Sequence, residues 1–275
     1  MLHPAPSGRF PWSNYRDNRH PARRNSDALL YASEILLDSN RPSKASFQII
    51  SLGYEVRMRK LTLLAATIGV LAIPTGQALA ACTAPSYSSA MRKAIPTTGI
   101  NQAQFSQALQ LAASFVRCKA GTKPLALHPK LTTVAATHSQ WMAKHAKLSH
   151  KSTVSGMQSM AIRLRSTGLR IGAGAENIAG FERYNFPAGA FTITNAATCK
   201  FKSQSGKPIP AHSYASLAET VVAGWMGSPG HRKNLLNRQY QHTGGGLGFD
   251  PKAQFCGRFY ITQDYIKWHG PASEN

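Results

Sequence analysis

The chain has 275 residues, of which 32 are Lys or Arg and 11 are Asp or Glu, so its formal net charge is +21. Its hydrophobic content of 43% and aromatic content of 9% exclude wholesale disorder, and its length allows one sizeable domain or two small ones. Four cysteines are too few for a disulfide-dense miniprotein but suit a domain with one or two disulfides.

Residues 58–80 have the three parts of a secretory signal peptide. A positive n-region at Arg59 and Lys60 precedes the apolar run 61–73, and an A-x-A cleavage motif ends at Ala80. The run of about 13 residues is shorter than the roughly 20 that a membrane-spanning helix needs. We therefore predict Sec-type export to the periplasm or the medium, with cleavage after Ala80.

The segment before this signal, residues 1–57, has no sustained helical or strand period. We interpret it as a disordered over-extension of the gene upstream of Met58; a long cytoplasmic pre-region is the alternative. The stretch 79–82 also fits a bacterial lipobox, in which Cys82 would be acylated and would anchor the protein to a membrane. Acylation would leave an odd thiol, so we favour the released form.

Cleavage leaves 195 residues with 22 basic and 6 acidic side chains, a net charge of +16. The basic residues are dispersed and lack aromatic interleaving, so we expect no nucleic-acid partner. Anionic envelope polymers or phospholipid surfaces are the counter-charges available to an exported protein, and a solvated basic surface is the alternative. Without repeats or long linkers, we expect a monomer with an N-terminal segment 81–100, one domain over 101–268 and a tail 269–275.

The cysteines of the exported chain form an even set. Four cysteines permit three pairings, and the sequence does not choose among them. We favour two disulfides, Cys82 with Cys118 and Cys199 with Cys256.

Several helices are expected in chain order. Asn101 is a suitable N-cap for a helix with apolar residues at three-four spacing up to Val116, and Pro129 opens a second helix. His138 and His145 lie on the apolar stripe of this second helix, so we expect both to face the core. Further helices are predicted over 158–165, 217–226 and 231–236.

The remaining segments are predicted to form loops and strands. Residues 168–186 are expected to be rich in loops, and 190–194 resemble a strand. Two more strands, 244–249 and 255–263, are joined by a turn. The glycines at 244–248 open no helix, so we interpret them as close backbone packing instead of a phosphate cradle. Helices before and after a small antiparallel sheet indicate an α+β fold.

Common catalytic motifs such as H-E-x-x-H, G-x-S-x-G and the P-loop are missing. The informative stretches are GTKPL at 121–125, LSH at 148–150, AENIA at 175–179, WMGSPGHRKNLL at 225–236 and YITQD at 260–264. In order and spacing they resemble a bacterial member of the CAP superfamily. These are SCP-like extracellular proteins, relatives of cysteine-rich secretory proteins, antigen 5 and plant pathogenesis-related proteins. The resemblance covers roughly residues 103–266.

The resemblance implies a three-layer α-β-α sandwich with a small central antiparallel sheet, and a shallow cleft that holds two His and two Glu in many relatives. By position, His150 and His231 correspond to the two histidines and Glu176 to the first glutamate. The position of the second glutamate is occupied by Ser228. The resemblance therefore implies a cleft that lacks one carboxylate.

Two imidazoles and a carboxylate can form a three-ligand Zn²⁺ site with a water in the fourth position. If Ser228 is an N-cap and Pro229 begins the helix, the helix dipole disfavours the charged form of His231 and keeps its ring able to bind metal. The alternative is a polar cluster that satisfies its own hydrogen bonds and fixes loops. Ser228 with His231 also suggests a nucleophile and base, but we favour the helix cap for Ser228.

Three functions follow from these features. The first, which we favour, is a secreted binding module without a required cofactor, whose His/Glu cleft takes a lipid, a sterol or a cell-envelope component. The second is a zinc-dependent, peptidase-like hydrolase in which Glu176 acts as the base for a metal-bound water. The third is a basic envelope-associated protein that binds anionic polymers through its surface. A site lacking one carboxylate is weak evidence for catalysis.

Overall fold

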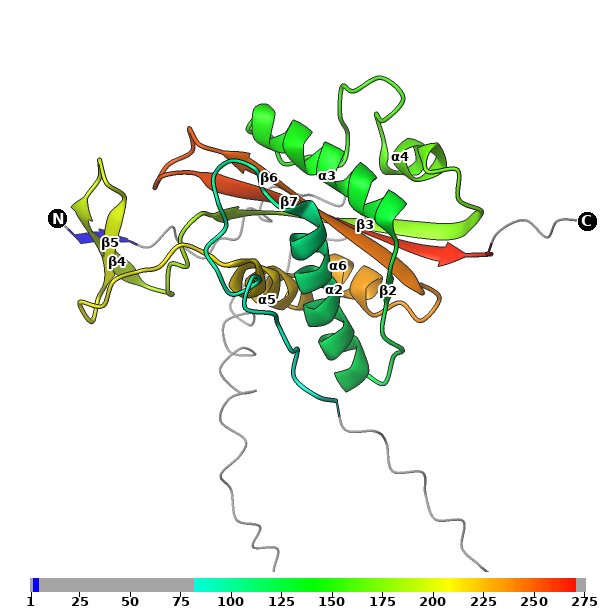
Figure 1. Cartoon of the computed structure of the whole chain (residues 1–275), viewed down its shortest axis with the longest axis horizontal. Coiled ribbons are helices and arrows are strands. Elements are labelled where there is room, and N and C mark those ends of the chain that lie inside the picture. Colours follow the sequence, from blue (N-terminus) through cyan, green and yellow to red (C-terminus); the bar gives the residue numbers. More distant parts are fainter. Residues whose placement is uncertain (1, 5–81, 271–275) are drawn as a thin grey trace, which may run out of the picture. The chain divides into compact units, whose positions relative to one another are not determined.

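The computed structural model describes residues 2–4 and 82–270, and the secondary structure is shown in Figure 1. The predicted signal peptide, most of 1–57 and the end of the tail lie outside the described residues. In the part of the chain that is described, no helix is long and apolar enough to cross a membrane.

A four-stranded sheet forms the middle layer. Its strands are β2 (Ala126–Leu127), β6 (His242–Asp250), β7 (Arg258–Trp268) and β3 (Ile171–Glu182), in that spatial order. The two-residue β2 pairs parallel with β6, whereas β6–β7 and β7–β3 are antiparallel. Strand β3 therefore lies at one edge of the sheet.

Helices cover both faces of this sheet. On one face lie α2 (Gln102–Lys119), α5 (Tyr214–Met226) and α6 (Pro229–Leu235). On the other lie α3 (Pro129–Lys144) and α4 (Met160–Ser166) (Figure 1). The expected α+β class and three-layer α-β-α sandwich are confirmed.

The glycines of β6 allow the helices to approach the sheet closely on both faces. A Cβ on Gly246 would lie 2.1 Å from the backbone nitrogen of Ala136 in α3. On the opposite face, a Cβ on Gly245 would lie 2.8 Å from Cδ2 of Leu109 in α2. This glycine run therefore serves backbone packing between strand and helix, as the sequence predicts.

The main core lies between the sheet and the α2/α5 layer. The segment before α2, residues 82–101, contributes to it. Tyr87, Met91 and Ile95 are buried there with residues of both helices. A disulfide joins Cys82 to Cys118 at the end of α2, as expected, so Cys82 is not available for the acylation that the lipobox suggests.

The largest difference from the sequence prediction is β3. Residues 168–186 read as loop, yet 171–182 form the longest strand of the sheet. The strand is covered on both faces, so it lacks the alternation that marks a half-buried strand. Its glycines permit this coverage: a Cβ on Gly174 would lie 2.4 Å from Cδ1 of Leu164 in α4.

Smaller differences concern element ends. Helix α5 begins three residues before the predicted start, because Ser213 and Ser216 form a capping box. Helix α6 begins two residues earlier than predicted, at Pro229, and β7 extends five residues beyond the predicted end. His145 does not face the core: it follows the last turn of α3 and is exposed.

A second, smaller sheet forms an arm outside the sandwich, at the left of Figure 1. It contains β4 (Ala190–Asn195), close to the predicted strand, and the unpredicted β5 (Lys200–Ser203). The short β1 (Leu2–Pro4) pairs with β4, although no strand was expected within residues 1–57. The predicted disulfide between Cys199 and Cys256 ties the arm to the β6–β7 connection.

Candidate functional site

Glu176 is the centre of the predicted cleft, and both oxygens of its carboxylate are hydrogen-bonded. It lies on β3, and its side chain is 1% exposed. Nδ1 of His150 lies 2.7 Å from Oε1, and Nη2 of Arg163 donates to Oε2 at 2.5 Å. Burial by itself would raise the pKa of Glu176, but the hydrogen bond from His150 and the charge of Arg163 hold that pKa below its usual value. Glu176 is therefore ionised and charge-paired.

His150 lies on the connection between α3 and α4, and Arg163 lies on α4. The Arg163 side chain is 1% exposed and also donates to the carbonyl oxygens of Met157 and His150. The arginine thus fixes the loop that carries His150 to the strand that carries Glu176. The His150 side chain is 33% exposed, so it is the member of this group that a ligand can reach.

His231 approaches from the opposite layer, on α6. Its Nδ1 lies 2.6 Å from Oγ of Ser228, three residues earlier. Burial and, to a lesser extent, the charge of His150 lower the pKa of His231 to about 4. The ring is therefore neutral at pH 7, as the sequence predicts, but for a different main reason: the sequence argument invoked the helix dipole, and the larger effect is burial.

Ser228 has the backbone conformation of an N-cap, but its side chain makes no capping hydrogen bond. Its hydroxyl is hydrogen-bonded to His231 instead. Ser228 is therefore the N-cap of α6, as favoured from the sequence, but its hydroxyl does not supply the capping bond. A serine hydroxyl on a neutral imidazole resembles part of a nucleophile–base pair, but such a pair also needs a third group that orients the base.

Two asparagines hold α6 against β3. The amide of Asn177 donates to the carbonyl oxygen of His231 at 3.1 Å and to the hydroxyl of Tyr265 at 3.2 Å. The amide of Asn234 donates to the side-chain oxygen of Asn177 at 2.9 Å. These bonds fix His231 relative to the edge strand. Asn177 thus anchors α6 to β3.

The three predicted zinc ligands are only partly brought together. His150 and Glu176 are in direct contact, and His231 is close enough for the charge of His150 to affect its pKa. Among residues 82–270, no group of three or more His, Cys, Asp or Glu side chains is arranged to hold a metal ion. The bonds to Arg163 and His150 also occupy the carboxylate that a metal would need. This arrangement does not fit a three-ligand zinc site, and the zinc site stays a prediction of the sequence.

Two buried residues near Glu176 were not identified as site residues from the sequence. Arg163 was not singled out, because α4 is too short for periodicity to show its inward face. The sequence signal that could have pointed to Arg163 is Glu176 itself, because a carboxylate within a buried strand needs a cation nearby. Asp264 on β7 is paired with Glu176 across the ladder and is fully buried. Burial and the negative charge of Glu176 raise the pKa of Asp264 well above its usual value.

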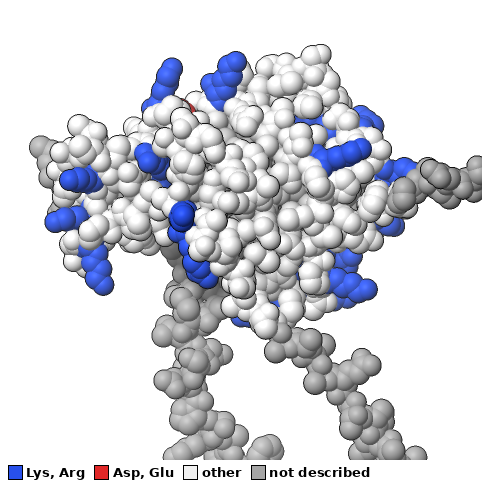
Figure 2. Space-filling model, viewed as in Figure 1, with Lys and Arg blue, Asp and Glu red and all other residues white. Residues whose placement is uncertain are grey.

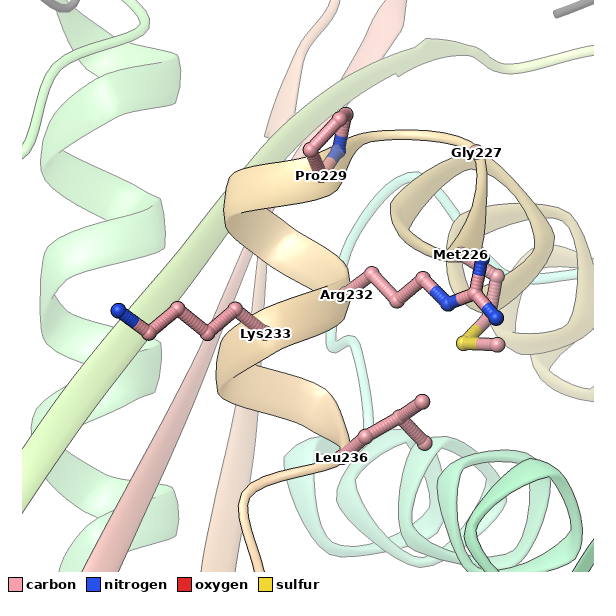
Figure 3. A pocket seen from close by; sticks show the side chains of 6 residues that line it. All are labelled: Met226, Gly227, Pro229, Arg232, Lys233 and Leu236. Carbon is pink, nitrogen blue, oxygen red and sulfur yellow. The ribbon is translucent and has the colours of Figure 1, made fainter. Parts of the chain in front are cut away.

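A separate hollow of about 410 Å³ lies between the end of α5 and the outer side of α6. Figure 3 shows the Arg232 side chain directed toward Met226, whereas Lys233 extends to the other side of α6. Leu236 and Pro229 supply further apolar lining. The lining also includes Lys233, and two cations beside apolar groups suit a ligand that has an apolar part and a negative charge.

The surface has very few acidic groups. Residues 82–270 contain 22 basic and 5 acidic side chains. Glu176, Asp250 and Asp264 are buried, and Glu182 is bonded to Arg258 at 2.6 Å. In Figure 2, Lys and Arg side chains are spread over the visible face and acidic ones are almost absent. The domain therefore presents a positive surface.

The chain is similar to several known proteins. An extracellular protein with an SCP domain from Bacillus anthracis is 24% identical with a TM-score of 0.38, over 59% of this chain and 40% of that one. A cysteine-rich secretory protein from Staphylococcus aureus is 17% identical with a TM-score of 0.37, over 62% and 41%. A stretch of 64 residues, 23% of this chain, is 42% identical to 15% of the uncharacterized membrane protein YlbC of Bacillus subtilis. The chain thus spans less than half of each of these relatives.

The family model for the cysteine-rich secretory protein family, CAP, matches residues 115–265. This range is more than half of the chain and contains His150, Glu176 and His231. The chain belongs to the cysteine-rich secretory protein (CAP) family.

Proposed function

We propose that the chain is an exported, non-catalytic binding module whose cleft around His150, Glu176 and His231 takes an extracellular ligand. The observation that carries this proposal is the pairing of the buried Glu176 carboxylate with both His150 and Arg163, one on each oxygen. A carboxylate that is buried and bonded on both oxygens is poorly suited to act as a base, and it rigidly positions the histidine beside it. These bonds support the proposal that the residues around Glu176 form a preformed binding surface.

Export is supported by the signal-like segment 58–80 and by the two disulfides, since disulfides persist in oxidising compartments. The ligand class that we propose is an amphiphilic lipid, with a sterol or another cell-envelope component as the alternatives. The hollow beside α6 is separate from the cleft, and its mixture of Arg232 and Lys233 with Met226 and Leu236 offers a second place for a ligand that is partly apolar and partly anionic.

The experiment is a binding measurement on the purified chain with a fatty acid, an anionic phospholipid, a sterol and a soluble peptidoglycan fragment, followed by native mass spectrometry. We expect one of these to bind, and His150→Ala to weaken that binding at least about tenfold, the value of roughly one charge-assisted hydrogen bond. The matched control is His145→Ala, because His145 is exposed and lies at the end of α3. Equal effects of the two substitutions, or binding of none of the four, would contradict the proposal.

The zinc-dependent hydrolase is the competing function. It requires Glu176 to bind a metal or accept a proton although each of its oxygens already accepts a hydrogen bond from His150 or Arg163. Stoichiometric zinc together with turnover that is lost in His231→Ala would favour this function over the binding module.

A further inference from the structure

The arm outside the sandwich carries positive charge without any acidic residue. We define the basic arm as residues 183–210, which include β4 and β5. The basic arm contains Arg183, Lys200, Lys202 and Lys207, and no Asp or Glu occurs between residues 182 and 219. Its formal charge is therefore +4, with no acidic side chain of its own to balance it.

The strand geometry places two of these lysines side by side. Along β5, Lys200 and Lys202 are exposed and the intervening Phe201 is buried. Side chains two residues apart on a strand point to the same face, about 7 Å from each other. The residues opposite them on β4 are neutral: Asn195 faces Lys200 and Thr192 faces Lys202.

A third lysine, Lys207, lies on the neighbouring segment, but on the opposite face of the arm from Lys200 and Lys202, because its cross-strand partner is Ser203. Lys202 forms a β-bridge with Pro208, the residue that follows Lys207, and the backbone nitrogen of Ser203 donates to the carbonyl oxygen of Lys207. Lys207 is exposed. Lys and Arg side chains project from this arm at the left of the view in Figure 2.

The basic arm is held rigidly. Phe191 and Phe201 are buried in an aromatic cluster that also includes Phe186 and Phe255, with ring centroids 4.4 to 6.5 Å apart. The Cys199–Cys256 disulfide fixes the residue directly before Lys200. A rigid surface loses little conformational entropy when it binds a partner, so its charges are presented at low cost.

A hollow of about 460 Å³ lies on the same arm and has a different chemistry. Its lining is neutral, from Pro187, Ala188, Ala190, Ser203, Gln204 and Ser205. The hydroxyls of Ser203 and Ser205 are 3.0 Å apart. Hydroxyl and amide groups both donate and accept hydrogen bonds, as the hydroxyls of a sugar do.

We propose that the basic arm is a second binding surface, separate from the cleft, that docks an anionic polysaccharide. Lys200 and Lys202 bind the carboxylate or phosphate groups of the polymer on one face of the arm. Lys207 and the neutral hollow contact the polymer where it passes around the turn at residues 203–207 to the other face. The spacing of the first two lysines favours a polymer with repeated charges over a single small anion. This inference does not depend on the ligand of the cleft.

The test uses the full chain and alginate, a polysaccharide with one carboxylate on each sugar, with uncharged dextran for comparison. The arm variant combines Lys200→Gln, Lys202→Gln and Lys207→Gln. The control variant removes the same charge from exposed lysines at the ends of α2 and α3, with Lys123→Gln, Lys144→Gln and Lys147→Gln. Each lysine beside an anionic surface contributes roughly fivefold in affinity, so the arm variant should bind alginate about ten- to a hundredfold more weakly.

The expected pattern is loss in the arm variant, at most about threefold change in the control variant, and retention when the same three lysines are replaced by arginine. An unchanged melting temperature shows that the arm variant is folded. Equal weakening by both triple variants would show that only the overall charge matters, and would overturn the proposal. So would arm-dependent binding to phosphatidylglycerol vesicles without binding to alginate, or alginate binding by the arm variant at wild-type strength.

Discussion

Asp264 lies on the central strand β7 and has no hydrogen-bond partner for either carboxyl oxygen among the described residues. It is 0% exposed, and its cross-strand neighbours are Glu176 on β3 and Gly244 on β6. Burial and the adjacent negative charge raise its pKa well above the usual value. Replacing this carboxyl by an apolar group of similar size, in Asp264→Val, should therefore stabilise the fold.

The size of the effect follows from the cost of a buried polar group without a partner, about 1–3 kcal/mol. A domain of this length gains roughly 2–4 °C in melting temperature for each kcal/mol, so Asp264→Val should melt about 2–12 °C higher at pH 7. The gain also depends on pH. A raised pKa means that the folded state holds the proton more tightly than the unfolded state, so the stability of the wild type falls as the pH rises through that pKa. The difference between the two proteins should thus grow from pH 4 to pH 7.

The measurement is thermal and urea unfolding of both proteins, followed by circular dichroism at several pH values. Asp250→Val is the matched control, because Asp250 is also buried but its Oδ1 accepts a hydrogen bond from the backbone nitrogen of Lys252 at 2.9 Å. The control should lower stability. A loss of stability in Asp264→Val similar to that of the control would refute the reasoning, since it would mean that the Asp264 carboxyl is satisfied in the folded protein.

Three further predictions concern packing, the buried ion pair and acid sensitivity. Gly246→Ala should cost about 1–3 kcal/mol or more through overlap with α3, whereas Gly230→Ala, which meets nothing within 4 Å, should not destabilise; urea unfolding compares them. Arg163→Gln should cost about 3–5 kcal/mol because it leaves Glu176 buried with one partner, and adding Glu176→Gln should recover most of that loss in a double-mutant cycle. Burial lowers the pKa of His212 to about 4, so the unfolded state takes up its proton first and stability falls as the pH drops from about 6.5 to about 4. His212→Gln should flatten that part of the stability curve, and an unchanged slope would contradict this.

The helices were predictable where local signals agree with packing. Asn101 accepts a hydrogen bond from the backbone nitrogen of Gln104, and Pro129 is the first residue of its helix. Strand β3 was not predictable in this way, because its glycines look like loop residues until the helix that packs on them is known. His145 shows the opposite error: it continues the apolar stripe of α3, but the helix ends at Lys144.

For the candidate site, the sequence suggested candidate residues but not the bonds that they make. His150 and Glu176 are in contact as the family resemblance implies. The arginine that neutralises Glu176 comes from a short helix without a motif, and the hydroxyl of Ser228 turns to His231 instead of the helix end. Both depend on the tertiary arrangement of loops and short helices, which spacing along the chain does not encode.

The central claim is that this cleft binds a ligand and performs no metal-dependent chemistry. The most direct measurement is zinc titration of the full chain by isothermal calorimetry, with the His231→Ala variant alongside. The account predicts no stoichiometric, tight zinc binding and the same weak heat in both proteins, because Arg163 and His150 occupy the Glu176 carboxylate. One equivalent of zinc bound with micromolar or better affinity and lost in His231→Ala would contradict it.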